Sequence, residues 1–300
     1  MRPLLVAGAN GQLGWELRRQ AMAFGYPCLS LTRAELDISD RVAVLQAVEE
    51  MRPAVIVNAA AYTAVDRAES EKEIAYAVNR NGAAHLAEGA ARAGVPLIHI
   101  STDYVYDGLK HGHYVEDDPV SPINVYGASK LAGEEAVRQI CAQHIILRTS
   151  WVFGVHGHNF VRTMLRLAAE RERLRVVDDQ HGSPTFAGDL AGAILALTKR
   201  LESGEDEGWG TFHCAGRGAT TWCRFAQQIF ALSAPVLGRA PEVLPITTAE
   251  FPTPARRPAN SVLDCGRLGR IHGIFLRSWQ TALAEMLDCV LQQTFLELSR

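Results

Sequence analysis

The sequence has little of what marks several large classes of protein. Its 300 residues carry 30 Lys and Arg against 33 Asp and Glu, so no basic excess points to nucleic acid. No apolar run reaches the ~18 residues that a membrane helix requires, and the first apolar stretch is too short for a signal peptide. The six cysteines are scattered without a C-x-x-C pair, which disfavours a disulfide framework or a zinc site. We therefore expect a cytoplasmic protein that binds neither membrane nor nucleic acid.

Short apolar runs alternate with longer helical patterns through the first half of the chain. In the longer stretches, apolar residues recur three and four positions apart, as on one face of a helix. This alternation is typical of a parallel sheet covered by helices on both faces, with a ligand crevice at the carboxyl ends of the strands. The expected strands are 3–8, 26–31, 54–60, 95–101 and 144–153, and the expected helices are 12–24, 40–51, 71–93 and 126–142.

The regular alternation of strand-like and helix-like stretches ends after about residue 150. Helix-like runs then alternate with irregular stretches, among them "ESGEDEGWG", which reads as an exposed loop, and a proline-rich segment at 251–260. We predict an α/β fold: a doubly wound, Rossmann-like parallel sheet with a smaller C-terminal substrate-binding portion. Residues 1–150 would form the dinucleotide-binding domain, with a returning helix near 187–201, and residues 151–300 mainly the substrate-binding portion.

A glycine-rich stretch, "VAGANGQLGWEL", joins the first expected strand to the first expected helix. Gly8, Gly11 and Gly14 have the spacing G-x-x-G-x-x-G, a variant of the dinucleotide fingerprint. Glycines there permit a tight turn, a close approach of the backbone to a pyrophosphate, and close packing of helix on strand. The free amides and the positive end of the helix would hold the phosphates. The stretch therefore predicts a dinucleotide site.

The end of the second expected strand distinguishes between two cofactors. An NAD site usually offers a carboxylate to the adenosine ribose at this point, but the strand ends in "LTR" and the first acidic residue is Glu35. The guanidinium of Arg33 suits a 2′-phosphate, which favours NADPH over the alternative, NADH. Asp37 and Ile38 are placed to flank the adenine.

The stretch "VYGASK" places Tyr126 and Lys130 four residues apart, on one face of an expected helix. Thr102 and Asp103 emerge at the carboxyl edge of the fourth expected strand, in "HISTDYVYDG", where the crevice lies. The phenol of tyrosine has an ordinary pKa of about 10, and a nearby ammonium is expected to lower it. A hydroxyl, a phenol and a lysine beside a dinucleotide form a complete set for reducing a carbonyl group.

Taken together, these motifs resemble the extended short-chain dehydrogenase/reductase superfamily, and most closely its dTDP-4-dehydrorhamnose reductases. The resemblance runs over nearly the whole chain. It implies reduction by NADPH of the C4 keto group of dTDP-4-dehydro-L-rhamnose, a nucleotide-sugar substrate, to dTDP-L-rhamnose for cell-surface polysaccharide. The stretches that carry it are "GANGQLGWEL", "PAVIVNAAAYTAVDRAESE", "STDYVYDG", "SPINVYGASKLAGE", "LRTSWVFG", "DDQHGSPT" and "PTPARRPANSVLD".

The resemblance also implies roles for single residues. Tyr126 would protonate the sugar carbonyl oxygen, Lys130 would bind the nicotinamide ribose and lower the pKa of the phenol, and Thr102 would hydrogen-bond the same oxygen. Asp103 and Trp151 would contact the sugar. The residues that fall where the family contacts the dinucleotide are Gly11, Gln12, Leu13, Ala61, Tyr62 and Thr63.

Members of this family can bind Mg²⁺ through acidic residues at a dimer contact. Glu16 matches one such position and Asp189 is a candidate for a second, whereas Asp288, near a third, is one residue out of register. The resemblance thus allows Mg²⁺ and a homodimer without requiring either. Alternatively, Glu16 is simply an acidic residue well placed in the first turn of a helix.

Two other functions remain open from the sequence. One is another nucleotide-sugar enzyme of the same fold, a second reductase, an epimerase or a 4,6-dehydratase. A dehydratase would place a glutamate after Thr-Asp, but the chain has Tyr104 there, which counts against dehydration. The other is a non-catalytic regulatory subunit of a methionine adenosyltransferase, because fold alone does not prove function. The intact set of Thr102, Tyr126 and Lys130 favours an enzyme.

Overall fold

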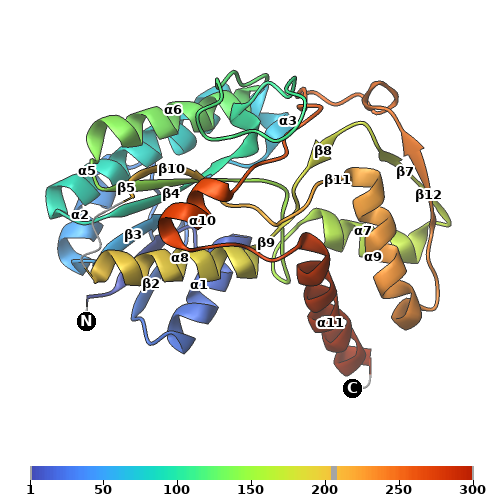
Figure 1. Cartoon of the computed structure of the whole chain (residues 1–300). Helices are drawn as coiled ribbons and strands as arrows, with labels where there is room; N and C mark the ends of the chain where they lie inside the picture. Colours follow the sequence, from blue (N-terminus) through green and yellow to red (C-terminus); the bar gives the residue numbers. More distant parts are fainter. Residues whose placement is uncertain (1, 204–207, 299–300) are drawn as a thin grey trace.

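The computed structural model describes residues 2–203 and 208–298, in which six parallel strands form the central sheet (Figure 1). Their order is β10-β5-β4-β3-β1-β2, so the strand order reverses direction beside β1. In such sheets ligands bind at this reversal, outside the carboxyl ends of the strands. The strands are β1 (Leu4–Ala7), β2 (Cys28–Leu31), β3 (Val55–Asn58), β4 (Leu97–Thr102), β5 (His144–Thr149) and β10 (Gly210–His213).

Helices cover both faces of this sheet, as the sequence predicted. One face packs against α1 (Gln12–Ala23) and α8 (Ala187–Glu202), and the other against α2 (Arg41–Met51), α5 (Ala83–Ala93) and α6 (Val125–Ile140). Every residue of β1 and most residues of β4 are buried, because a strand covered on both faces exposes neither side. Each fully buried Leu, Ile or Val contributes about 1.5–3 kcal/mol to folding.

A second group of elements from the C-terminal half has an apolar core of its own, which includes the fully buried Phe225. Its α9 begins where the Thr221 hydroxyl accepts a hydrogen bond from the Arg224 amide (3.2 Å), and ends at Gly238 with a φ of +69°. The elements are α7 (Phe160–Glu170), α9 (Trp222–Leu237), α11 (Trp279–Leu298), and the strand pairs β7 (Arg173–Val177) with β12 (Glu242–Ile246), β6 (Val152–Phe153) with β9 (Thr185–Phe186), and β8 (His181–Gly182) with β11 (Thr220–Thr221).

The two halves of the sequence are interleaved in space. Both α8 and β10 come from beyond residue 150 and belong to the central sheet and its cover. The domain boundary at residue 150 stays a prediction. The remaining short elements are α3 (Val65–Ala68), α4 (Lys72–Tyr76), the π-helix η1 (Ala77–Gly82), the 3₁₀ helices η2 (Asp103–Val105) and η3 (Thr248–Glu250), and α10 (Gly266–His272).

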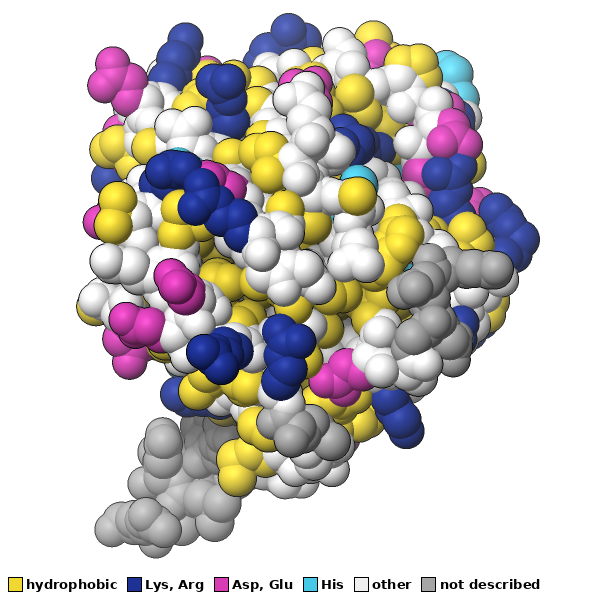
Figure 2. All heavy atoms as spheres, turned by 90° about the vertical axis from the view of Figure 1, so that its left-hand side faces the viewer, with side chains coloured by type: hydrophobic (Ala, Val, Ile, Leu, Met, Phe, Trp, Pro, Cys, Tyr) yellow, Lys and Arg dark blue, Asp and Glu magenta, His cyan; other side chains and the backbone are white. Residues whose placement is uncertain are grey.

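Two expected elements are more broken than their patterns suggested. The helix expected over 71–93 contains η1, a wider turn between α4 and α5, and the strand expected over 144–153 is interrupted at Trp151, whose φ is +47°. The loop expected at "ESGEDEGWG" lies partly outside the described residues. No helix in the described ranges is both long and apolar enough to cross a membrane. Figure 2 shows acidic, basic and apolar side chains interspersed on one face of the molecule.

Candidate active site

Two adjoining cavities open at the carboxyl ends of the strands, beside the reversal of strand order. The larger has a volume of about 520 Å³ and the smaller about 240 Å³. Asn10, Gly11 and the segment 59–61, which follow β1 and β3, line both of them. The two cavities therefore form one continuous crevice at the place where this fold holds its ligand.

The glycine loop forms the floor where the cavities meet. Gly8 has a φ of +94°, and a Cβ on it would lie 2.7 Å from the backbone nitrogen of Ala60. A Cβ on Gly14 would lie 2.2 Å from the Gly8 carbonyl oxygen, so no side chain fits at either position. Gly11 precedes α1 and no side chain caps the helix. Uncapped amides at a helix N-terminus fit the phosphates of a dinucleotide.

The smaller cavity contains the residues expected around the adenosine. Arg33, Asp37, Ile38 and Tyr62 line it. The Arg33 Nε lies 3.2 Å from Asp37 Oδ2, and three quarters of the arginine side chain (76%) is exposed. Hydrogen bonds from Ser39, together with this guanidinium, hold the pKa of the Asp37 carboxyl below its ordinary value. The cavity thus has the Arg33 guanidinium at its rim, and the Asp37 carboxylate compensates part of the positive charge of that guanidinium.

The loop after β3 is held by a residue that the sequence did not single out. Buried Asn79, in η1, accepts a hydrogen bond from the Tyr62 amide (2.8 Å) and donates one to the Ser129 hydroxyl (2.9 Å) of α6. It therefore connects the cofactor loop with the helix that bears Tyr126. π-helical turns often occur at functional sites, but no sequence pattern marks this one.

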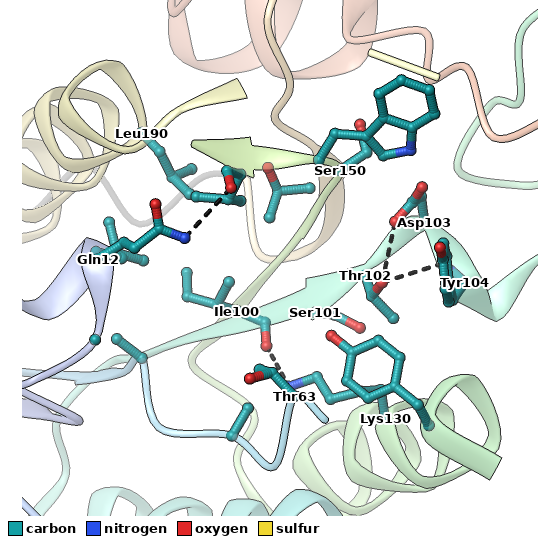
Figure 3. A pocket seen from close by; sticks show the side chains of 18 of the residues that line it. Gln12, Thr63, Ile100, Ser101, Thr102, Asp103, Tyr104, Lys130, Ser150 and Leu190 are labelled. Atoms are coloured by element: carbon teal, nitrogen blue, oxygen red, sulfur yellow. Dashed lines mark hydrogen bonds between the residues drawn. The ribbon is translucent and has the colours of Figure 1, made fainter. Parts of the chain in front are cut away.

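Tyr126 and Lys130 enter the larger cavity from the first turns of α6. The Asn124 side chain caps this helix by accepting a hydrogen bond from the Gly127 amide (2.7 Å). A Cβ on Gly127 would lie 2.1 Å from the Tyr104 carbonyl oxygen, so glycine allows α6 to approach the end of β4. Tyr126, Lys130 and Thr102 consequently line one cavity, as predicted. Figure 3 shows Lys130 reaching from α6 to the Ile100 carbonyl.

The electrostatics of this pair differ from the expectation. Burial raises the pKa of Tyr126 to about 12, the Asp103 charge acts in the same direction, and only hydrogen bonding with Thr102 opposes them. The Lys130 ammonium instead donates to the Ile100 carbonyl (2.5 Å), and burial lowers its pKa to about 8. The expected lowering of the phenol's pKa by Lys130 is therefore wrong for this structure, because loss of water around the phenol outweighs any charge nearby.

Thr102 and Asp103 form the opposite side of the reaction cavity. The Thr102 hydroxyl donates to Asp103 Oδ1 (3.0 Å) and accepts from the Tyr104 amide (3.2 Å) (Figure 3). Burial raises the pKa of the Asp103 carboxyl to about 7, although the Ser261 and Thr102 hydroxyls oppose this rise. Tyr104 packs edge-on against the Tyr126 ring, with centroids 5.9 Å apart.

An aromatic pair closes the far end of the larger cavity. The indoles of Trp151 and Trp222 stack face to face, with centroids 3.5 Å apart and planes at 8°. A Cβ on Gly182 would lie 2.3 Å from the Trp151 ring, so the indole is fixed between a tryptophan and a glycine. Trp151 lines the cavity as expected. Sequence reasoning missed Trp222, which is 71 positions away and comes from α9.

The remaining expected cofactor contacts also lie in the crevice. Gln12 donates to the Val152 carbonyl (3.3 Å) and accepts from Asn159 (3.0 Å), which links α1 to the C-terminal half. The other predicted contacts that line the larger cavity are Leu13, Ala61 and Thr63.

The candidate metal ligands do not form a metal site. Glu16 is buried and already accepts hydrogen bonds from Arg19 (2.8 Å) and Gln20 (3.0 Å), while Asp189 pairs with Arg277 (2.9 Å). No group of three or more acidic, histidine or cysteine side chains in the described ranges could hold an ion. Both carboxylates have cationic or amide partners within the chain, so the expectation of a metal at Glu16 is not supported.

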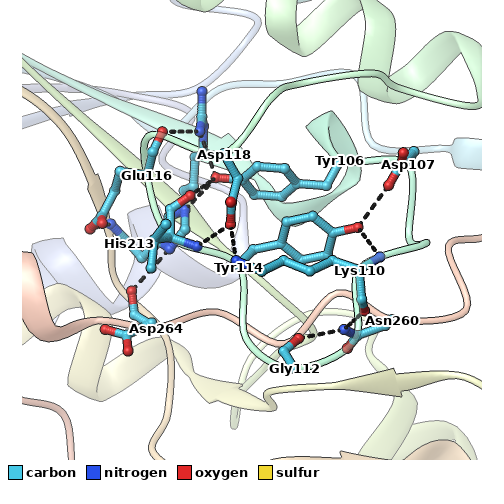
Figure 4. Close-up of polar contacts among 12 residues, drawn as sticks. Tyr106, Asp107, Lys110, Gly112, Tyr114, Glu116, Asp118, His213, Asn260 and Asp264 are labelled. Atoms are coloured by element: carbon cyan, nitrogen blue, oxygen red, sulfur yellow. Dashed lines mark hydrogen bonds and ion pairs between the residues drawn. The ribbon is translucent and has the colours of Figure 1, made fainter.

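A buried polar network lies behind the catalytic helix. The Glu134 carboxylate, one turn beyond Lys130, pairs with Arg148 of β5 (2.7 Å), whose guanidinium also donates to the Tyr106 hydroxyl (2.7 Å). That hydroxyl lies 2.7 Å from His213 Nε2, and burial lowers the pKa of this histidine to about 4, so the imidazole is neutral (Figure 4). The network joins β4, β5, β10 and α6 beneath the cavity.

Comparison with known proteins now places this geometry in a family. Residues 1–292 match the family model described as RmlD substrate binding domain. A dTDP-4-dehydrorhamnose reductase of Sinorhizobium fredii is 46% identical over 96% of this chain and 97% of its own. The chain belongs to the dTDP-4-dehydrorhamnose reductase family.

Other dTDP-4-dehydrorhamnose reductases agree in sequence and in structure. The protein of Escherichia coli K12 is 40% identical over 95% of this chain and 97% of its own. The crystal structure of the Bacillus anthracis protein in complex with NADP superposes with a TM-score of 0.89 at 38% identity, covering 96% of this chain and 99% of that one. The likeness spans both the sheet and the C-terminal elements, so it includes both cavities.

Proposed function

We propose that the protein reduces the C4 keto group of dTDP-4-dehydro-L-rhamnose with NADPH, giving dTDP-L-rhamnose. The observation that carries the proposal is the convergence of Tyr126, Lys130 and Thr102 on a cavity continuous with the glycine loop. Family membership supplies the sugar nucleotide, and the crevice has room for both ligands. The intact donor set favours this enzyme over a regulatory subunit.

Each cavity residue has a part in the reaction. NADPH, when bound, supplies the hydride that reduces the carbonyl carbon. A Tyr126 phenol with a pKa of about 12 keeps its proton at neutral pH, so the donor is loaded before each turnover. As negative charge develops on the sugar oxygen, Tyr126 donates this proton and the Thr102 hydroxyl hydrogen-bonds the same oxygen. The Lys130 ammonium, one helical turn away on the same cavity wall, is held by the Ile100 carbonyl and would bind the nicotinamide ribose.

The cofactor preference rests on Arg33. We expect a higher specificity constant with NADPH than with NADH, because the guanidinium at the rim of the smaller cavity can pair with a 2′-phosphate. Such a charge-assisted hydrogen bond contributes about 1.5–3 kcal/mol, so Arg33→Ala should reduce the preference by roughly tenfold or more. The matched control is Arg41→Ala, an exposed arginine of α2 that pairs with Glu88 outside the cavity. Equal specificity constants for the two cofactors in the unmodified protein would contradict the assignment.

Product analysis tests the proposed function directly. The purified protein is incubated with NADPH and dTDP-4-dehydro-L-rhamnose, and the sugar nucleotide is identified by nuclear magnetic resonance. Formation of dTDP-L-rhamnose with one NADPH oxidised per product is the expected result. Cofactor binding without turnover would point to the regulatory class, and a 6-deoxy product of other stereochemistry to another reductase.

The cysteines favour a location in the cytoplasm. The six cysteines form no disulfide in the structure, which suits a reducing compartment such as the cytoplasm. A homodimer stays a prediction from the family resemblance.

A further inference from the structure

The environment of Asp103 is unusual for a carboxyl group. Its side chain is 3% exposed and lines the larger cavity. Oδ1 accepts the hydrogen bond from Thr102, while Oδ2 is buried and has no hydrogen-bond partner among the described residues. Burying an ionised carboxylate costs free energy when no cation and too few hydrogen-bond donors lie beside it. The surroundings of Asp103 therefore favour the protonated, neutral form of its carboxyl group.

The elements packed around Asp103 face it with uncharged groups. They are the hydroxyl of Thr102 on β4, the phenol of Tyr126 on α6, the Tyr104 ring, and the hydroxyl of Ser261 from the C-terminal segment. The cations of the same elements are paired elsewhere, Lys130 with the Ile100 carbonyl and Arg257 with Asp66. A proton on Asp103 is therefore not displaced by a neighbouring positive charge.

Thr102 stands between this carboxyl and the catalytic phenol. Its hydroxyl is bonded to Asp103, and it is also the group whose hydrogen bonding acts on the Tyr126 phenol. Figure 3 shows the bond between Asp103 and Thr102. Since Thr102 also acts on the Tyr126 phenol, the three side chains supply a series of exchangeable protons that ends at the proton donor.

We propose that Asp103 is the proton source that reloads Tyr126 after each reduction, through the Thr102 hydroxyl. The inference rests on the proposed function. Once the sugar oxygen has taken the phenol's proton, Tyr126 is a phenolate. The Thr102 hydroxyl, which donates to Asp103 Oδ1 in the resting structure, turns toward the phenolate. Its O–H bond breaks as its proton passes to the Tyr126 oxygen, and the Asp103 O–H bond breaks as its proton passes to the Thr102 oxygen.

Solvent supplies the proton that Asp103 has given up. Asp103 is left as a carboxylate and takes one proton from water after the product leaves the cavity. No electrons move other than those of the hydride, and each turnover consumes one proton. Because the acid form is the donor and the pKa is about 7, turnover is sustained below neutral pH and declines as the pH rises through that value.

Rapid kinetics with Asp103→Asn test the proposal, because the amide cannot supply the proton. NADPH oxidation should show a burst of one equivalent per site, since Tyr126 begins loaded, and then a steady rate at least ~10-fold lower. The wild type should show no burst. Its steady rate should fall above neutral pH, whereas the variant's should not follow that titration.

Three further variants separate a relay from a general disturbance of the cavity. Thr102→Val should also give a burst of one equivalent, but a slower one, because the sugar oxygen loses a hydrogen bond; Thr102→Ser, which keeps a hydroxyl, should restore both the burst and the steady rate. Asp107→Asn is the matched control: this carboxylate, four positions on, bonds the Leu109 amide and the Tyr114 hydroxyl outside the cavity. It should show no burst.

Infrared titration provides a readout that needs no turnover. The difference between wild type and Asp103→Asn should contain a protonated carboxyl band that disappears as the pH rises through neutrality. A carboxylate already ionised well below neutrality overturns the relay, as does an Asp103→Asn enzyme without a burst and with the wild-type pH profile. Absence of rhamnose product from the wild type would instead overturn the proposed function, so the two failures are distinguishable.

Discussion

Replacing Tyr126 by Phe should lower kcat by at least ~100-fold while leaving NADPH affinity almost unchanged. The change removes one hydroxyl from a half-buried ring and leaves the ring's edge contact with Tyr104 in place. Without the phenol, only the Thr102 hydroxyl remains to stabilise the developing oxyanion, and an aliphatic alcohol is a weaker acid than a phenol, so proton delivery to the sugar oxygen is slow. Steady-state kinetics and cofactor titration by fluorescence measure the two quantities separately.

The control for this substitution is Tyr26→Phe. Tyr26 is a buried tyrosine whose pKa, like that of Tyr126, is raised by burial to about 12, but it lies after α1 and lines neither cavity. Its loss of a hydroxyl should leave kcat near the wild-type value. A Tyr126→Phe enzyme with a rate close to that of Tyr26→Phe would remove the phenol from the mechanism.

The features that local sequence can specify were predicted well. The strands of the sheet and the helices beside them follow from apolar runs and helical spacing, because every residue of a strand such as β3 is buried. The glycine loop could also be located, since Gly8 and Gly14 leave no space for a side chain and glycine is visible in the sequence.

Features that depend on contacts between distant segments could not be predicted. Trp222 reaches the cavity only because α9 packs beside Trp151, and Asn79 braces α6 from a different helix. The direction of the Tyr126 pKa shift was wrong for the same reason. Spacing on a helix gives the distance to a charge, but the cost of losing water depends on everything that folds around the phenol.

Breaking the ion pair beneath the catalytic helix should cost more stability than breaking an ion pair on the surface. Glu134 is fully buried, and its partner Arg148 is 3% exposed. Two parallel hydrogen bonds of 2.9 and 2.7 Å join them, and Ser101 donates a third to the carboxylate (2.5 Å). Glu134→Ala would leave the guanidinium buried without its carboxylate, at a cost of about 3–5 kcal/mol in the free energy of unfolding.

Urea denaturation of matched variants measures this cost. The control is Glu170→Ala, which breaks the ion pair with Arg166 on α7, where both side chains are about half exposed or more (62% and 49%). A surface pair of that kind contributes only about 0–1 kcal/mol. Both glutamates pair with arginine, but Glu134 is buried and also bonds Arg138 and Ser101, so the difference between the variants measures the effect of burial together with these added contacts. Equal losses of stability would contradict the prediction.

A double variant distinguishes two possibilities for the Glu134–Arg148 pair. Either the pair itself stabilises the fold, or stability is lost only when one buried charge is left without its partner. Glu134→Leu with Arg148→Met removes both charges and keeps apolar volume, and such replacements are often neutral or stabilising. Here, however, Arg148 also donates to the Tyr106 hydroxyl, whose other contacts include His213. We therefore expect the double variant to recover part of the stability lost in Glu134→Ala, but not all of it, because Tyr106 loses a buried donor. Its kcat should fall as well, since Glu134 holds α6 against β4 and β5 one turn beyond Lys130.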